Sequence, residues 1–128
     1  MSEGSLDPTQ DIAKALAKGM KLVESAPCSI ILDLDSKAAM AQYNVMLPRI
    51  QRDLVIVERE RWESKTKDKN HWHVVLETDI MLTPVTRLLL QTILGSDPMK
   101  EFLSLVRYRA GYGVFSILFR PPLVNEED

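Results

Sequence analysis

The sequence predicts a single α+β domain in which helices cover one face of an antiparallel sheet. Two observations support this fold class. The chain has 128 residues, of which 45% are hydrophobic and 27% are charged, and this is the size and composition of one globular domain. Helical and strand patterns follow one another in the order helix, then strand–helix–strand–strand–helix–strand. A chain of this length buries enough apolar surface to fold without disulfides.

A helix is expected first, over residues 8–25, preceded by a flexible tail over residues 1–6. Asp7 offers a carboxylate N-cap, and Pro8 suits the first helical position because its missing N–H would have no partner there. The spacing of the apolar residues predicts an amphipathic helix of about four turns. These residues are Ile12, Ala15, Leu16, Gly19, Met20 and Val23.

Three strand patterns occupy the middle of the chain. Residues 29–35 are compact and apolar, and residues 54–62 and 71–77 are joined by a short polar turn, which predicts an antiparallel hairpin. A helix is expected between the first two strands, capped by Ser36 and ended or kinked by Pro48.

The C-terminal part predicts two further helical segments and a fourth strand. Thr83 and the proline after it start a helix that Gly95 closes. Asp97, also followed by proline, starts a further helical turn. Residues 114–119 form the last strand.

The order of these elements matches the ferredoxin-like βαββαβ fold, with the helix over residues 8–25 as an N-terminal addition. Right-handed crossovers then fix the strand order as 4-1-3-2 in one antiparallel sheet, with helices on one face. The strands over 29–35 and 71–77 are central neighbours in that order. The domain is expected to extend over residues 7–122, and an acidic tail follows over residues 123–128.

Charge and cysteine content limit the possible functions. The formal net charge of −2 argues against a dedicated electrostatic DNA binder, so contact with nucleic acid would need a local patch. The single cysteine, Cys28, excludes a disulfide framework and a CxxC metal site within the chain. The polar N-terminus is unlike a signal peptide, and no apolar run approaches about 18 residues. We therefore expect a cytoplasmic protein without a membrane span.

Four polar residues are expected to meet on the open face of the sheet. Side chains alternate along a strand, so Asp33 and Asp35 share one face of their strand, as His71 and His73 do on theirs. Because the two strands are antiparallel neighbours, the end of the first lies beside the start of the second. Each pair alone is also typical of a solvated strand end. Carboxylates suit Mg²⁺ or Mn²⁺ and imidazoles suit Mn²⁺ or Zn²⁺, so the four together predict a site for Mg²⁺ or Mn²⁺.

Two short motifs resemble those of archaeo-eukaryotic primases and primase-polymerases. SIILDLD, at residues 29–35, is similar to that family's motif of three hydrophobic residues, Asp, a hydrophobic residue and Asp. KNHWHVVLE, at residues 69–77, resembles its second motif, a small residue, any residue and a histidine on a strand. The resemblance implies an RRM-like palm, catalytic metal on Asp33 and Asp35, and a nucleotide-phosphate contact from His73 or His71. It implies nucleotidyl transfer in DNA replication, with a nucleic acid or nucleotide as partner.

A second resemblance points to a different reaction, the nicking of DNA by a tyrosine. HWH, at residues 71–73, is similar to the His-hydrophobe-His motif of rolling-circle replication initiators and relaxases, the HUH class. Those nicking domains use a tyrosine on a helix as nucleophile, and Tyr108 would fill that role by attacking a DNA phosphate. The candidate catalytic residues are therefore Asp33, Asp35, His73 and Tyr108.

Three arginines outside this cluster are little offset by acids and are candidate phosphate contacts, namely Arg107, Arg109 and Arg120. The alternative function is a non-catalytic ferredoxin-like module that acts as an adaptor or a homodimer. Its amphipathic N-terminal helix would dock on the partner, and the Asp/His cluster would be a degenerate site.

Overall fold

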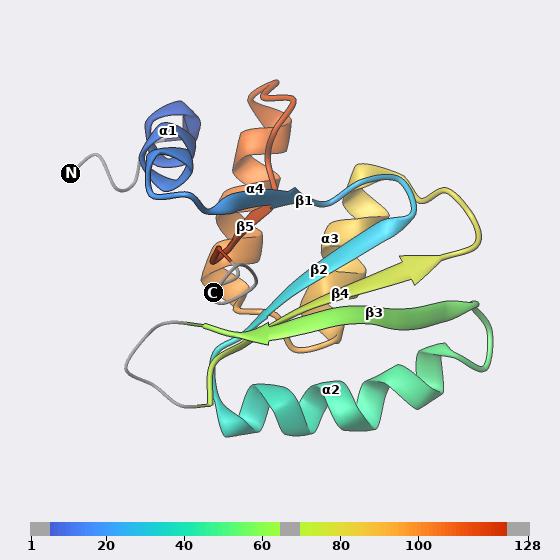
Figure 1. Cartoon of the computed structure of the whole chain (residues 1–128). Helices are drawn as coiled ribbons and strands as arrows, with labels where there is room; N and C mark the ends of the chain where they lie inside the picture. The colour runs from blue at the N-terminus through green and yellow to red at the C-terminus, as the bar shows by residue number, and fades with distance from the viewer. Residues whose placement is uncertain (1–5, 65–69, 123–128) are drawn as a thin grey trace.

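The computed structural model describes residues 6–64 and 70–122, which form a mixed α+β structure (Figure 1). The predicted α+β class is therefore confirmed. The expected tails, apart from Leu6, lie outside the described residues. The elements are α1 (Thr9–Ala17), β1 (Lys21–Glu24), β2 (Ser29–Leu34), α2 (Lys37–Ile50), β3 (Ile56–Glu63), β4 (Trp72–Thr78), α3 (Pro84–Ile93), α4 (Pro98–Arg109) and β5 (Ile117–Arg120).

β2, β4 and β3 form a three-stranded antiparallel sheet with β4 in the centre. In the β2–β4 register, Asp33 lies opposite His73 and Leu34 lies opposite Trp72. In the β3–β4 register, Trp62 also lies opposite His73. The two neighbour relations predicted for these strands are confirmed, and they bring Asp33, His73 and Trp62 into one row across the sheet.

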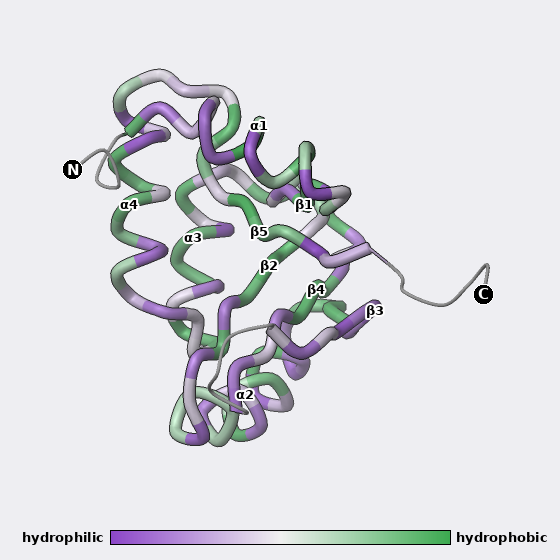
Figure 2. Tube along the Cα trace, turned by 60° about the vertical axis from the view of Figure 1, so that its left-hand side comes forward, coloured by the Kyte–Doolittle hydropathy of each residue, from purple (hydrophilic) through white to green (hydrophobic). Residues whose placement is uncertain are grey.

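α2 covers one face of this sheet and completes the hydrophobic core. The Ser36 hydroxyl caps the helix by accepting the Ala39 N–H, as predicted, whereas Pro48 lies inside the helix, which continues to Ile50. Figure 2 shows hydrophobic stretches along β2 and β4 in the middle of the molecule. Burial of each large aliphatic side chain contributes about 1.5–3 kcal/mol. The core residues are Ile30, Leu32, Leu34, Tyr43, Ile56, Val74, Leu76 and Leu94.

The last strand does not join this sheet, so the predicted order 4-1-3-2 and the ferredoxin-like arrangement are wrong. β5 instead pairs antiparallel with β1 in a second, two-stranded sheet, where Leu22 lies opposite Phe119 (Figure 1). β1 lies in the segment predicted as the end of the helix over residues 8–25. Gly19 explains the difference, because its φ of +82° is a left-handed conformation that ends α1 after Ala17.

Side chains from α3 and the turn after it occupy the edge of β2 where the fourth strand was expected. The Ile31 N–H donates to Gln91 Oε1 at 3.2 Å, and the Asp33 N–H donates to Ser96 Oγ at 2.9 Å. The Asp97 N–H donates to the Asp33 carbonyl oxygen at 2.8 Å. Because these three outward backbone groups of β2 already have partners, a further strand could not form a regular ladder along this edge.

The two C-terminal helices begin as predicted. Thr83 and Asp97 each accept a backbone N–H from the first helical turn, and a proline follows each cap. Gly95, with φ +101°, closes α3. α4 is longer than the single turn that was expected. None of the helices within residues 6–64 and 70–122 has the length and apolar character needed to cross a bilayer.

Candidate metal centre

Three of the four predicted ligands meet where β2 ends and β4 begins. Asp33 is the penultimate residue of β2, His73 lies opposite it in β4, and His71 stands immediately before β4. One ligand atom from each of the three lies within 4.8 Å of the other two. The antiparallel pairing of β2 with β4 produces this proximity, and the predicted order 4-1-3-2 contained the same pairing although it misplaced the last strand.

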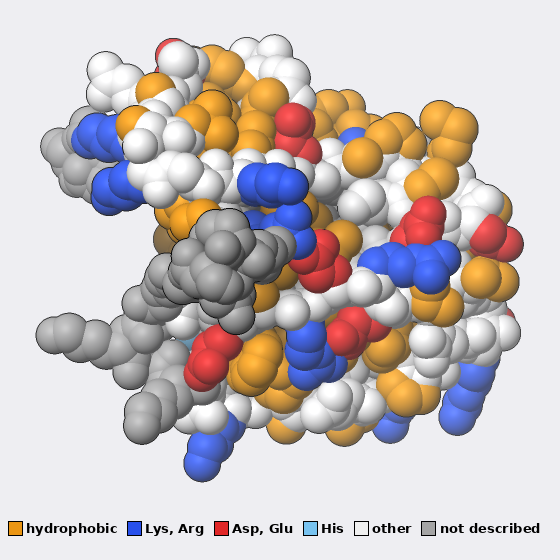
Figure 3. All heavy atoms as spheres, in the orientation of Figure 1, with side chains coloured by type: hydrophobic (Ala, Val, Ile, Leu, Met, Phe, Trp, Pro, Cys, Tyr) orange, Lys and Arg blue, Asp and Glu red, His pale blue; other side chains and the backbone are white. Residues whose placement is uncertain are grey.

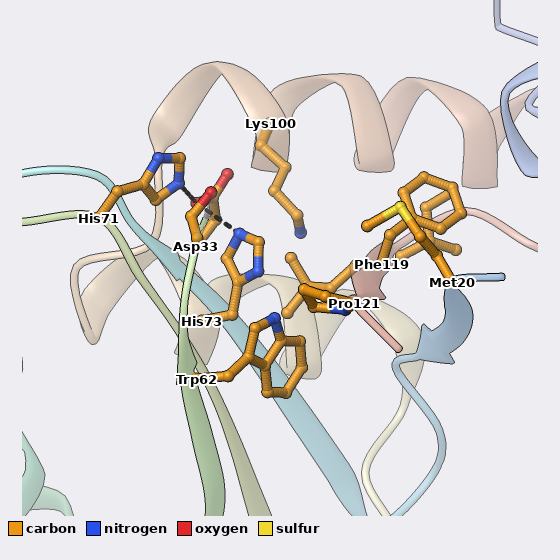
Figure 4. A pocket seen from close by; sticks show the side chains of 11 residues that line it. Met20, Asp33, Trp62, His71, His73, Lys100, Phe119 and Pro121 are labelled. Carbon is orange, nitrogen blue, oxygen red and sulfur yellow. Dashed lines mark hydrogen bonds and ion pairs between the residues drawn. The ribbon is translucent and has the colours of Figure 1, made fainter. Parts of the chain in front are cut away.

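The Asp33 carboxylate is the centre of the group. Its Oδ1 is hydrogen-bonded to His71 Nε2 and lies 3.3 Å from His73 Nε2 (Figure 4). The three side chains are only 13–17% exposed, and the two imidazole rings stand nearly perpendicular, with centroids 5.2 Å apart. Two imidazole nitrogens and one carboxylate oxygen this close together form a donor set that divalent transition metals favour.

The charge state of Asp33 suits metal binding. Burial raises the pKa of the Asp33 carboxyl, but hydrogen bonds from His73 and His71 outweigh that effect and hold the pKa below its ordinary value of 3.8. The carboxyl group is therefore ionised at neutral pH, which is the form that a metal ligand requires.

The three residues open onto a cavity of about 490 Å³ between the two sheets. Lys100 of α4 and Trp62 of β3 also line it, and Figure 4 shows both side chains reaching toward His73. The Trp62 ring stands edge-on to the His73 ring, with centroids 5.4 Å apart. This volume is in the range of small-molecule sites. The rest of the wall is formed by Met20, Ser64, Ile117, Leu118, Phe119 and Pro121.

Two buried nitrogens at this cavity have no hydrogen-bond partner in the part of the chain that the structure describes. They are Nε1 of Trp62, which can only donate, and Nδ1 of His73. If His73 Nε2 binds a metal ion, Nδ1 carries the ring proton and is also a donor. An unpaired buried donor costs about 1–3 kcal/mol, so both atoms favour an acceptor supplied from the cavity.

Asp35, the fourth predicted ligand, is not part of the group. β2 ends at Leu34, so the alternation of side chains does not continue to Asp35, which is exposed. Ser36 then turns the chain into α2. The structure therefore does not place Asp33 and Asp35 together, and the centre has one carboxylate from this strand.

Tyr108 lies away from the histidines. It is in the last turn of α4, where its ring packs against Phe115 with centroids 5.3 Å apart. Lys100, which lines the cavity, precedes it by eight residues, or about 12 Å along the helix. The structure therefore does not bring the predicted nucleophile to His71 and His73.

None of the three predicted phosphate-binding arginines lines the cavity. Arg107 is buried and its Nε donates to the Leu6 carbonyl oxygen at 2.8 Å, while Arg120 forms an ion pair with Glu60. Arg109 is exposed at the end of α4. On the face shown in Figure 3, cationic and acidic side chains are interspersed, and this is not the appearance of a basic patch.

Two residues of the cavity were missed as site residues by the sequence patterns. Trp62 lies opposite His73 in the hairpin, so the predicted pairing of the two strands could have placed Trp62 beside the histidine. Lys100 reaches the cavity because α4 begins directly after the turn that covers the edge of β2. No spacing in the sequence indicates that placement.

Comparison with known proteins gives no relative. The chain matches no protein-family model, no curated protein and no solved structure. The fold and site define it as an α+β protein with a candidate two-histidine, one-carboxylate metal centre. Because a fold alone does not fix an activity, the function is argued from the site.

Proposed function

We propose that this chain binds a divalent transition-metal ion through Asp33, His71 and His73 and uses it in phosphoryl or nucleotidyl transfer on a nucleic acid or nucleotide. The observation that carries the proposal is the convergence of the three ligand atoms, within 4.8 Å of one another, on the wall of a cavity. Of the residues that the primase resemblance names, Asp33, His71 and His73 lie in the group and Asp35 does not, and this remaining part of the resemblance supports the reaction class.

The donor set favours Mn²⁺ over Mg²⁺. Mg²⁺ prefers oxygen ligands and keeps several waters, whereas imidazole suits transition metals such as Fe²⁺ and Zn²⁺, and Mn²⁺ is the transition-metal ion that also suits the carboxylate. Two imidazoles and one carboxylate leave coordination positions for water and for a substrate oxygen. An ion held there would polarise a phosphoryl oxygen and stabilise the charge that develops during transfer.

The cavity beside the centre supports an anionic ligand with an apolar part. Lys100, whose Nζ also lies 3.3 Å from the Glu101 carboxylate, contributes a cation to its wall, and the unpaired N–H of Trp62 contributes a donor. Met20, Phe119 and Pro121 supply apolar surface on the other side. A phosphate near Lys100 and Trp62, with a base or sugar against the apolar wall, satisfies both sets of contacts.

A titration with Mn²⁺, followed by paramagnetic broadening of backbone NMR signals, tests the metal site. We expect broadening centred on Asp33, His71 and His73 in the wild type, and none in Asp33→Asn. Asp35→Asn is the matched control, because it removes a neighbouring exposed carboxylate that lies outside the group, and it should bind like the wild type. Diffuse broadening, or equal loss in both variants, would refute the site and favour the non-catalytic module.

Activity assays then test the reaction class. With Mn²⁺ present, we expect templated nucleotide transfer or cleavage of a phosphodiester, and loss of either in Asp33→Asn. Assays for primer synthesis and for strand nicking separate the two activities that the sequence motifs suggest. Localised Mn²⁺ binding without either activity would retain the metal centre and reject phosphoryl transfer.

A further inference from the structure

The backbone of Asp33 is held on the outer edge of β2 by the turn between α3 and α4. Its N–H donates to Ser96 Oγ at 2.9 Å, and its carbonyl oxygen accepts the Asp97 N–H at 2.8 Å. Ser96 is only 1% exposed, so bulk water has no access to replace its contact. Both polar backbone groups of this metal-ligand candidate are therefore fixed from the side opposite β4.

Ser96 is oriented in turn by Glu101. The Ser96 hydroxyl donates to Glu101 Oε2 at 2.7 Å, so its single proton is committed and its oxygen lone pairs are left to accept the Asp33 N–H. The other carboxylate oxygen, Oε1, accepts from Gln91 Nε2 at 2.7 Å, and Gln91 Oε1 accepts the Ile31 N–H. One buried carboxylate thus fixes two points on the edge of β2.

The same carboxylate also reaches the cavity. Lys100 Nζ, whose side chain lines the cavity wall, lies 3.3 Å from Glu101 Oε2. Glu101 is 4% exposed, and a carboxylate at that depth is tolerated only when donors surround it. Gln91, Ser96 and Lys100 supply those donors, and a fully satisfied network of this kind makes its surroundings rigid.

We propose that Ser96 and Glu101 are positioning residues of the metal centre, because they fix the edge of β2 so that Asp33 Oδ1 stays within reach of both imidazoles. The inference rests on the proposed function for the ion, while the positioning of Asp33 against His71 and His73 is a property of the protein alone. Residues that orient metal ligands typically change affinity by 10–100-fold when removed. Ser96 acts through the backbone, so we expect about tenfold, at the lower end of that range.

Ser96→Ala tests the inference, with Ser104→Ala as its matched control. Ser104 is also buried, at 2% exposed, but its hydroxyl donates to the Lys100 carbonyl oxygen of its own helix and not to the network. Ser96→Ala should raise the Kd for Mn²⁺ about tenfold, and Ser104→Ala should change it less than about twofold. Ser96→Thr keeps a hydroxyl and should restore much of the affinity. Urea unfolding of each variant separates loss of affinity from loss of stability.

A second measurement needs no metal. The imidazole ¹⁵N chemical shifts of His71 and His73 report their hydrogen bonds to Asp33, and they should move in Ser96→Ala but not in Ser104→Ala. Glu101→Gln provides a second variant, since it turns one of two accepting oxygens into a donor and should move the same signals.

The outcomes distinguish the two proposals. If the wild type binds no Mn²⁺ but the imidazole shifts respond to Ser96→Ala, the proposed function fails and the positioning role stands. If Mn²⁺ binds and neither its Kd nor the imidazole shifts distinguish Ser96→Ala from Ser104→Ala, the positioning role is refuted and the metal site stands.

Discussion

Gly95→Ala should destabilise the fold much more than Gly111→Ala, although the two glycines have nearly the same φ angle. Gly95 has φ +101° and Gly111 has φ +95°, so an alanine at either position is strained by about 1–2 kcal/mol. The surroundings differ. A Cβ at Gly95 would lie 2.7 Å from the carbonyl oxygen of Ala39 in α2, whereas a Cβ at Gly111 meets nothing within 4 Å.

The contact at Gly95 is with backbone, which cannot rotate away, so relieving it requires the end of α3 to move from α2. Overpacking of this kind costs about 1–3 kcal/mol. We therefore expect a total loss of about 2–5 kcal/mol for Gly95→Ala, against about 1–2 kcal/mol for Gly111→Ala. Urea unfolding measures both, and with a slope of about 2 kcal/mol/M the midpoints should differ by about 1 M. Equal midpoints would show that backbone conformation alone, and not the close approach to Ala39, explains this glycine.

Two further predictions concern charged pairs. Hydrogen bonding from Arg61 holds the pKa of Glu58 below its ordinary value of 4.5, against the opposing effect of burial and with help from the Tyr43 hydroxyl. A lowered folded-state pKa stabilises the fold above the unfolded-state pKa. The difference in unfolding free energy between wild type and Glu58→Gln should therefore shrink as pH falls below the ordinary value of 4.5. A constant difference down to about pH 2 would contradict this. Arg120→Met removes the ion pair with Glu60, in which the Arg120 side chain is 26% exposed and the Glu60 side chain 39%. The free energy of unfolding, measured in urea, should fall by about 0.2–1 kcal/mol, and by less at about 1 M NaCl because salt screens the pair. A loss above about 2 kcal/mol would show that this pair is needed to hold the two sheets together.

The sequence predicted the starts of helices well, because the residues that cap a helix belong to a few types with a specific role. Ser36, Thr83 and Asp97 cap helices because a short polar side chain next to a helix start accepts a free backbone N–H. Gly19 fits the same logic, since a glycine commonly ends a helix, but its position matches the helical spacing of residues 8–25. Apolar spacing favoured continuation of the helix there, whereas the glycine adopts a left-handed conformation that stops it.

The candidate site was predictable as far as strand pairing determines it. Asp33 and His73 face each other because β2 and β4 pair, and the predicted order 4-1-3-2 contained that pairing although it misplaced the last strand. Asp35 was not predictable in the same way, because alternation along a strand holds only while the strand lasts, and β2 ends one residue earlier. Ser96 and Glu101 act through side chains brought together by tertiary packing, which leaves no periodic signal.

The error in strand order and the existence of the cavity have the same cause. With Gln91 and Ser96 hydrogen-bonded along the edge of β2, β5 pairs with β1 and forms a second sheet. Three consecutive residues of the C-terminal segment, 117–119, then form one wall of the cavity, facing the three ligands on the other sheet. A fourth strand hydrogen-bonded to β2 would have extended the first sheet, and these residues would not have faced the ligands across a separate cavity. The covered edge of β2 therefore both fixes Asp33 and leaves the space in which a ligand can reach it.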